Sequence, residues 1–108
     1  MNTEFVHSSF AGDPDLGELV DIFVDDMPGR IHALETQAEI GDWREVRRTA
    51  HQLKGSVGSY GFHAITPAAA RLEEVLDEGR QEEEVLSALD ELLSLCRRVR
   101  AGEPGQVS

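Results

Sequence analysis

Apolar residues recur along most of the chain at the three- and four-residue spacing that is typical of amphipathic helices. The first run extends from about residue 13 to residue 40 and stays in phase across Pro28. It therefore predicts either one long helix kinked at this proline or two nearly collinear helices. Asp13 followed by Pro14 is a favourable start, because aspartate caps a helix and proline suits its first position.

Three further helices are predicted downstream. Gly41 ends the first helical region, and Asp42 can cap a second helix that runs to about Tyr60. The apolar spacing then predicts helices over residues 66–79 and 81–100. No run alternates between apolar and polar residues as a half-buried strand would. Four amphipathic helices with short connections predict an all-α antiparallel four-helix bundle with an extra or kinked N-terminal helical segment.

The chain divides into three predicted regions. Residues 1–12 lack a periodic pattern and are expected to form an N-terminal arm. Residues 13–101 are expected to form the helical bundle, and residues 102–108 a flexible C-terminal tail. A single domain is expected, because 108 residues support one modest core.

Charge and cysteine content exclude several classes of protein. The formal net charge is −11, so phosphate backbones would repel the chain and we expect no nucleic-acid partner. No apolar run approaches membrane-spanning length, and the first ten residues lack the pattern of a signal peptide, so no membrane association is expected. The lone Cys96 forms no internal disulfide, which fits a reducing compartment. We expect a cytoplasmic monomer.

The helix predicted to follow Asp42 divides its residues between two sides. At about 100° per residue, the apolar side includes Leu53 and Val57 and faces the core. The opposite side collects a histidine, two glycines and several cations, namely Arg44, Arg47, Arg48, His51, Lys54, Gly55 and Gly58. His51 is therefore expected near the middle of the solvent-exposed side rather than in the core.

The cations and the glycines on this side each permit two interpretations. The arginines either pair with acidic neighbours or create a positive field that attracts an anion or an acidic partner. A glycine inside a helix costs about 1 kcal/mol relative to alanine, and on the core side it would serve close helix packing. Gly55 and Gly58 lie on the side of His51 instead. They therefore predict an uncovered patch on which another protein can approach the imidazole.

An exposed neutral imidazole is a good nucleophile near neutral pH. Lys54 lies three residues after His51 on the same helical side. A nearby cation favours the neutral ring and would stabilise a phosphoryl group at the ring nitrogen. No Asp or Glu lies three or four residues from His51 in the sequence. Glu73 and Glu74, on the next predicted helix, are expected to belong to a solvated face.

The chain resembles the histidine-containing phosphotransfer (HPt) domain family over about residues 13–100. The likeness rests on a set of residues in order, namely Ala50, His51, Leu53, Lys54, Gly55, Gly61 and Leu72-Glu73. The upstream residues Phe23, Pro28, Leu34 and Gly41-Asp42-Trp43 also look like the first hairpin of that family.

The resemblance implies a mechanism. His51 would accept a phosphoryl group on Nε2 from a receiver-domain aspartate, or from a kinase, and pass it to another receiver aspartate. Lys54 would stabilise the phosphoryl group and Gly55 would give clearance. The implied partners are a response-regulator receiver domain and a hybrid histidine kinase. Mg²⁺ is expected only on the receiver, so we expect no cofactor on this chain. The sequence has no ATP-binding motif, so we expect no kinase activity of its own. The docking surface that we predict comprises Gly55, Gly58, Gln52, Arg47, Arg48 and Arg44.

Two alternatives remain open at this stage. A non-catalytic docking or sequestration module could bind a receiver or another signalling partner through the same face, with His51 incidental. A four-helix metal or cofactor bundle would need inward-facing Glu and His ligands on several helices. His7, His32, His63 and Cys96 show no metal-ligand spacing, so we expect no metal site.

Overall fold

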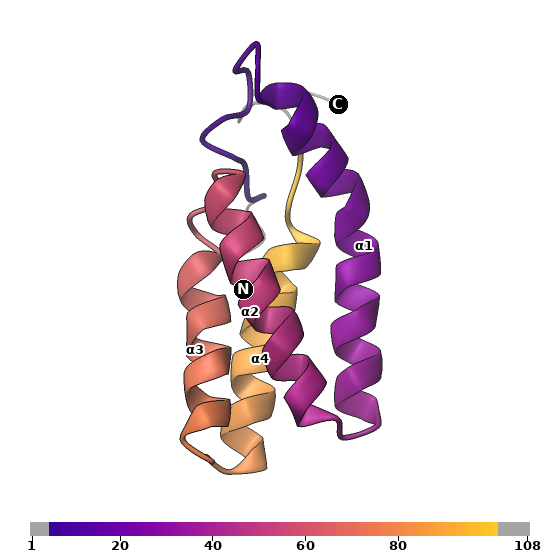
Figure 1. Ribbon diagram of the computed structural model, residues 1–108, viewed down its shortest axis with the longest axis vertical. Coiled ribbons are helices and arrows are strands. Elements are labelled where there is room, and N and C mark those ends of the chain that lie inside the picture. Colours follow the sequence, from indigo (N-terminus) through magenta and orange to yellow (C-terminus); the bar gives the residue numbers. More distant parts are fainter. Residues whose placement is uncertain (1–4, 102–108) are drawn as a thin grey trace.

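Four helices form an antiparallel bundle in the computed structural model, which describes residues 5–101 (Figure 1). The helices are α1 (Gly17–Glu39), α2 (Trp43–Ser59), α3 (Thr66–Asp77) and α4 (Glu82–Arg97). Each helix packs against two others, in the cyclic order α1, α2, α3, α4. The predicted all-α bundle is therefore confirmed. Within the described residues no helix has the length and apolar content needed to cross a membrane.

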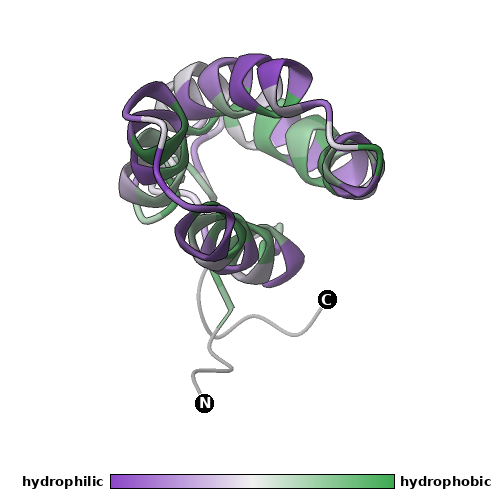
Figure 2. Ribbon diagram, turned by 90° about the horizontal axis from the view of Figure 1, so that it is seen from below, coloured by the Kyte–Doolittle hydropathy of each residue, from purple (hydrophilic) through white to green (hydrophobic). Residues whose placement is uncertain are grey.

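The core takes residues from every helix. Leu34, Leu53, Leu72 and Leu92 are almost completely buried, one from each of α1 to α4, and Phe62 joins them from the α2–α3 connection. Viewed along the bundle, the polar residues lie mainly on the outer sides of the helices (Figure 2). Burying such side chains contributes about 1.5–3 kcal/mol each, so this shared core fixes the rotation of each helix about its axis.

The helix boundaries follow the predicted signals closely at α2. Gly41 adopts a φ of +74°, a conformation that suits glycine, and reverses the chain after α1. The backbone N–H of Glu45 donates a hydrogen bond to the Asp42 carboxylate, which caps the first turn of α2. Gly61, with a φ of +82°, follows the other end of the helix. These two turns mark where α2 begins and ends.

The start of α1 differs from the prediction. The Asp13 carboxylate accepts hydrogen bonds from the backbone N–H groups of Asp15 and Leu16, but the turn that it caps precedes the helix. The helix itself begins at Gly17 and continues through Pro28 to Glu39 as one element rather than two. Residues 13–16 therefore form a capped turn that leads into α1.

Residues 5–12, which we call the N-terminal strap, lie across one end of the bundle. The Val6 N–H donates to the carbonyl of Arg98, and the Arg100 N–H donates to the carbonyl of Val6. The Ser9 N–H donates to the carbonyl of Gly61, where an added Cβ would lie 2.7 Å from the Ser9 hydroxyl. Glycine at position 61 thus allows the strap to approach the end of α2. The predicted tail, residues 102–108, lies outside the described residues.

Candidate functional site

His51 lies in the middle of α2 on the side that faces solvent. Its side chain is 63% exposed, whereas Ala50, Leu53 and Val57 of the same helix are buried. The helix phase expected from the sequence is thus the observed one. It follows because the apolar side of α2 packs between its neighbours in the bundle and turns the opposite side outward.

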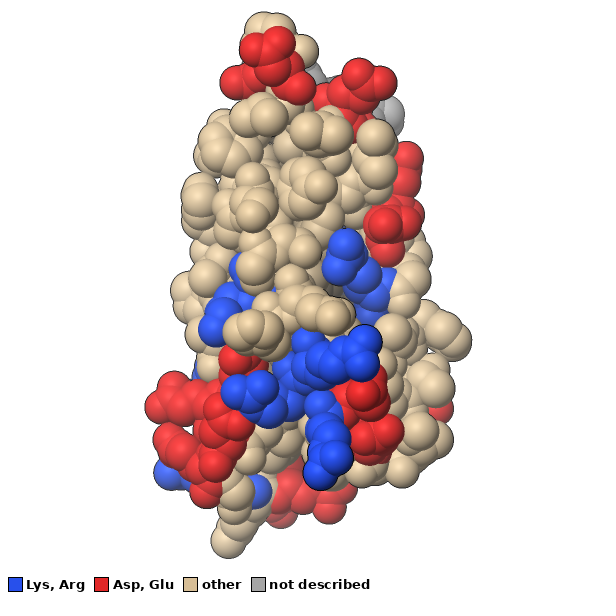
Figure 3. All heavy atoms as spheres, in the orientation of Figure 1, with Lys and Arg blue, Asp and Glu red and all other residues tan. Residues whose placement is uncertain are grey.

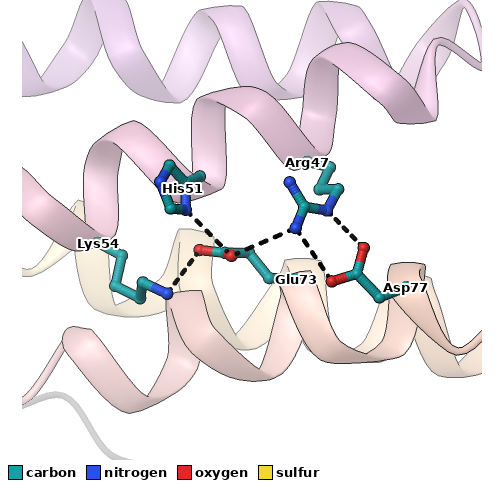
Figure 4. A network of polar contacts seen from close by, with 5 residues as sticks. All are labelled: Arg47, His51, Lys54, Glu73 and Asp77. Atoms are coloured by element: carbon teal, nitrogen blue, oxygen red, sulfur yellow. Dashed lines mark hydrogen bonds and ion pairs between the residues drawn. The ribbon is translucent and has the colours of Figure 1, made fainter.

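A buried carboxylate contacts the exposed histidine. Glu73, on α3, is only 7% exposed, and its Oε2 atom lies 3.2 Å from His51 Nδ1 (Figure 4). Its Oε1 atom lies 3.1 Å from Lys54 Nζ, an ion pair, and Oε2 is also 3.9 Å from an Arg47 nitrogen. One carboxylate from α3 therefore joins the histidine and two cations of α2.

The expectation that Glu73 belongs to a solvated face is wrong. Packing of α3 against α2 covers Glu73, while the adjacent Glu74 remains exposed. Two cations within ion-pair distance offset the cost of burying the carboxylate. A signal was available in the sequence, since Leu72-Glu73 is part of the pattern that resembles the HPt family.

The contact with Glu73 selects one form of the imidazole ring. An ionised carboxylate can only accept hydrogen bonds, so the proton of a neutral His51 ring lies on Nδ1 and is donated to Glu73. The lone pair is then on Nε2, and Figure 4 shows the second ring nitrogen turned away from Glu73. The arrangement presents an exposed, unprotonated nitrogen and stabilises positive charge that develops on the ring.

The arginines of α2 are largely engaged with acidic neighbours. Arg47 donates two hydrogen bonds to Asp77, at 2.5 and 3.0 Å, and this guanidinium lowers the pKa of Asp77 below its ordinary value. Arg48 forms an ion pair with Glu45 at 3.5 Å. Arg47 and Arg48 thus have acidic neighbours, as one of the two interpretations of the sequence expected, and their place in the docking surface stays a prediction. Arg44 is exposed on the same helix.

The glycines of α2 leave the surface beside His51 open. A Cβ added at Gly55 or Gly58 would have no atom of another element within 4 Å. Gly55 lines a shallow groove together with His51, Gln52, Ser56, Ser59 and Tyr60. Neither glycine is needed for helix packing, and Gly55 keeps bulk out of the groove that contains His51.

The remaining histidines and the cysteine form no comparable site. His32 and His63 are exposed on α1 and in the α2–α3 connection. Burial raises the pKa of Cys96 to about 12, so its thiol stays protonated as part of the core. Among residues 5–101, no group of three or more His, Cys, Asp and Glu side chains is arranged to hold a metal ion.

Comparison with known proteins assigns the family. Residues 18–102 match the Hpt domain, which is most of the chain and includes α2, α3, α4 and all of α1 except Gly17. Neither the curated proteins nor the solved structures include a match. Hpt domains serve as histidine phosphocarriers in phosphotransfer relays and are not themselves kinases. The chain therefore belongs to the Hpt domain family, and its general role is that of a phosphotransfer carrier.

Proposed function

We propose that His51 is the phosphoacceptor, taking a phosphoryl group from the aspartyl phosphate of a receiver domain and passing it to another receiver aspartate. One observation carries this proposal. His51 Nδ1 lies 3.2 Å from the buried Glu73 carboxylate, on a helix side that two glycines keep uncovered. A histidine held in this way offers Nε2 to a partner in a fixed orientation, which suits an incoming phosphoryl group.

The proposed transfer balances without an external acid or base. The Nε2 lone pair of His51 attacks phosphorus, the bond between phosphorus and the aspartate oxygen breaks, and the carboxylate leaves with the bonding electrons. The ring keeps its proton on Nδ1 and becomes positively charged as the N–P bond forms. Glu73 accepts a hydrogen bond from that N–H and stabilises the developing charge. The reverse sequence returns the phosphoryl group to a receiver.

Lys54 is the cation best placed to stabilise the transferred group. It lies one turn from His51 on α2. Its Nζ atom forms an ion pair with Glu73 Oε1 at 3.1 Å, and the lysine side chain is one-third exposed. The long side chain can turn from this carboxylate toward phosphoryl oxygens on His51. Arg47 is less available, because Asp77 binds its guanidinium through two hydrogen bonds.

The partner supplies the rest of the chemistry in this proposal. Mg²⁺ would be bound by the acidic pocket of the receiver, where it neutralises the phosphoryl oxygens. The phosphoryl group would enter the relay from a receiver or from a hybrid histidine kinase, since we assign no kinase activity to this chain. We place the reaction in the cytoplasm and the carrier in a monomeric state.

The experiment is a transfer assay with the wild-type chain. A receiver domain phosphorylated with radiolabelled acetyl phosphate and then desalted is mixed with the chain. We expect label to appear on the chain within minutes, to be lost in acid and to survive in base, as phosphohistidine does. Label should return to a second, unphosphorylated receiver. A chain that binds the receiver but never acquires label would contradict the proposal and favour a pure docking module.

A further inference from the structure

The surface beside the proposed phosphoacceptor is divided by charge. Lys and Arg side chains gather in the lower half of the face in Figure 3, whereas a broad uncharged surface occupies most of the upper half, with acidic side chains at its top and right edge. The sequence explains the upper half. Neither residues 5–12 nor residues 55–70 contain Lys, Arg, Asp or Glu, although these types make up 29% of the chain. We call the exposed part of these two segments the charge-free surface.

The N-terminal strap and the end of α2 build this surface together. The Ser8 hydroxyl donates a hydrogen bond to the carbonyl of Tyr60, and the Ser9 N–H donates to the carbonyl of Gly61. A second groove lies between the strap and the α2–α3 connection, and Ser9, His63 and Ala64 are among its lining residues. The strap lies outside residues 18–102, the part of the chain that matches the Hpt domain. This groove is therefore formed partly by residues that do not belong to that match.

The two grooves are close enough to lie under one partner. Tyr60 lines the groove that contains His51, and the next residue, Gly61, lines the groove of the strap. From His51 to Tyr60 the helix rises about 14 Å at about 1.5 Å per residue. A standard interface covers about 800 Å² on each partner, which corresponds to a disc of about 16 Å radius. A protein that covers His51 and extends toward the end of α2 therefore reaches the strap.

The lower half of the face is a weaker candidate for docking. Three of its cations already have acidic partners on the chain, since Arg47 contacts Asp77, Arg48 contacts Glu45 and Lys54 contacts Glu73. A partner that docked there would have to displace these ion pairs.

We propose that the receiver domain docks over the charge-free surface, and that the N-terminal strap forms part of its binding site. This inference rests on the proposed function of His51. The contacting surface of the receiver is uncharged, with apolar and hydrogen-bonding side chains that enter the groove beside Ser9, His63 and Ala64. Recognition then depends on short-range contact, so it persists at high salt despite the net charge of −11.

The test introduces one charge into the groove of the strap. Ala64 is exposed in the α2–α3 connection, and Ala64→Glu and Ala64→Lys place opposite charges at the same point. Ser87→Glu and Ser87→Lys are the controls, because Ser87 is exposed on α4 outside the charge-free surface. Thermal unfolding of each variant confirms that the bundle is intact.

The rate measured is phosphoryl transfer from the acetyl-phosphate-charged receiver at limiting concentration. We expect both Ala64 variants to slow it about tenfold or more, because either charge must be desolvated on docking. The Ser87 variants should stay within about twofold of the wild type. Between about 50 mM and 500 mM NaCl the wild-type rate should change less than about threefold.

Phosphoramidate, a small donor that needs no docking, separates this inference from the proposed function. All variants should take phosphate from it on His51 at the wild-type rate. Receiver transfer that is unaffected by either Ala64 substitution would overturn the docking site, and so would acceleration by one charge and slowing by the other. A wild-type transfer rate that falls steeply between about 50 mM and 500 mM NaCl would also overturn the docking site. Failure of phosphoramidate to label wild-type His51 would instead contradict the proposed function itself.

Discussion

Replacing His51 with glutamine is expected to abolish phosphoryl uptake, a reduction of at least about a thousandfold, while the fold is kept. Glutamine has no ring nitrogen that can form an N–P bond, so the loss should be complete rather than partial. The side chain at position 51 is 63% exposed, and a glutamine amide can still donate to the Glu73 carboxylate. The midpoint of thermal unfolding should therefore change by no more than a few degrees.

The control for this variant uses the other exposed histidines. His32→Gln and His63→Gln change the same side chain on α1 and in the α2–α3 connection. Both should take up phosphate from phosphoramidate at the wild-type rate. Uptake that survives in His51→Gln, or disappears in one of the controls, would place the phosphoacceptor elsewhere.

Replacing Glu73 with glutamine is expected to slow phosphoryl uptake about 10- to 100-fold without eliminating it. Glu73 acts as a positioning residue, since it contacts His51 Nδ1 and not the transferred group. A glutamine amide can donate to Nδ1 as readily as accept from it, so part of the ring population would carry its proton on Nε2 and be unreactive. Removing the carboxylate that orients a metal-ligating histidine typically lowers activity about 10- to 100-fold, and we expect a reduction of the uptake rate of the same size here.

Glu74→Gln is the matched control, because it removes the same charge from the adjacent, exposed position. Its uptake rate from phosphoramidate should stay within about twofold of the wild type. A merely structural role for Glu73 would change stability alone, so the ring tautomer provides the deciding readout. The ¹⁵N shifts of His51 should report Nδ1–H in the wild type and in Glu74→Gln, and a mixture in Glu73→Gln. Equal rates for the two variants would contradict the positioning role.

The outward placement of His51 could be predicted because it depends on one helix only. Leu53 and Val57 mark the buried side of α2, and the 3.6-residue period then places His51 opposite them. The bounds of α2 were also accessible, since Gly41 and Asp42 carry specific turn and cap chemistry. Such inferences are local and need no knowledge of how the helices pack.

Glu73 and the N-terminal strap could not be predicted in the same way. The contact between His51 and Glu73 joins residues 22 positions apart, and it depends on how far α3 is shifted along α2. Periodicity does not fix that shift. The strap lacks a period altogether, because backbone hydrogen bonds to Arg98 and Gly61 hold it rather than an amphipathic helical face. Contacts of this kind appear only once the bundle is assembled.

The position of the phosphoryl group on the ring tests the central claim most directly. The chain is labelled with ¹⁵N at histidine, phosphorylated, and examined by NMR for coupling between phosphorus and the ring nitrogens. We predict a single phosphohistidine at position 51, with phosphorus on Nε2 and a proton on Nδ1, because Glu73 occupies the Nδ1 side of the ring. Phosphorus on Nδ1 of His51, or on His7, His32 or His63, would contradict this account.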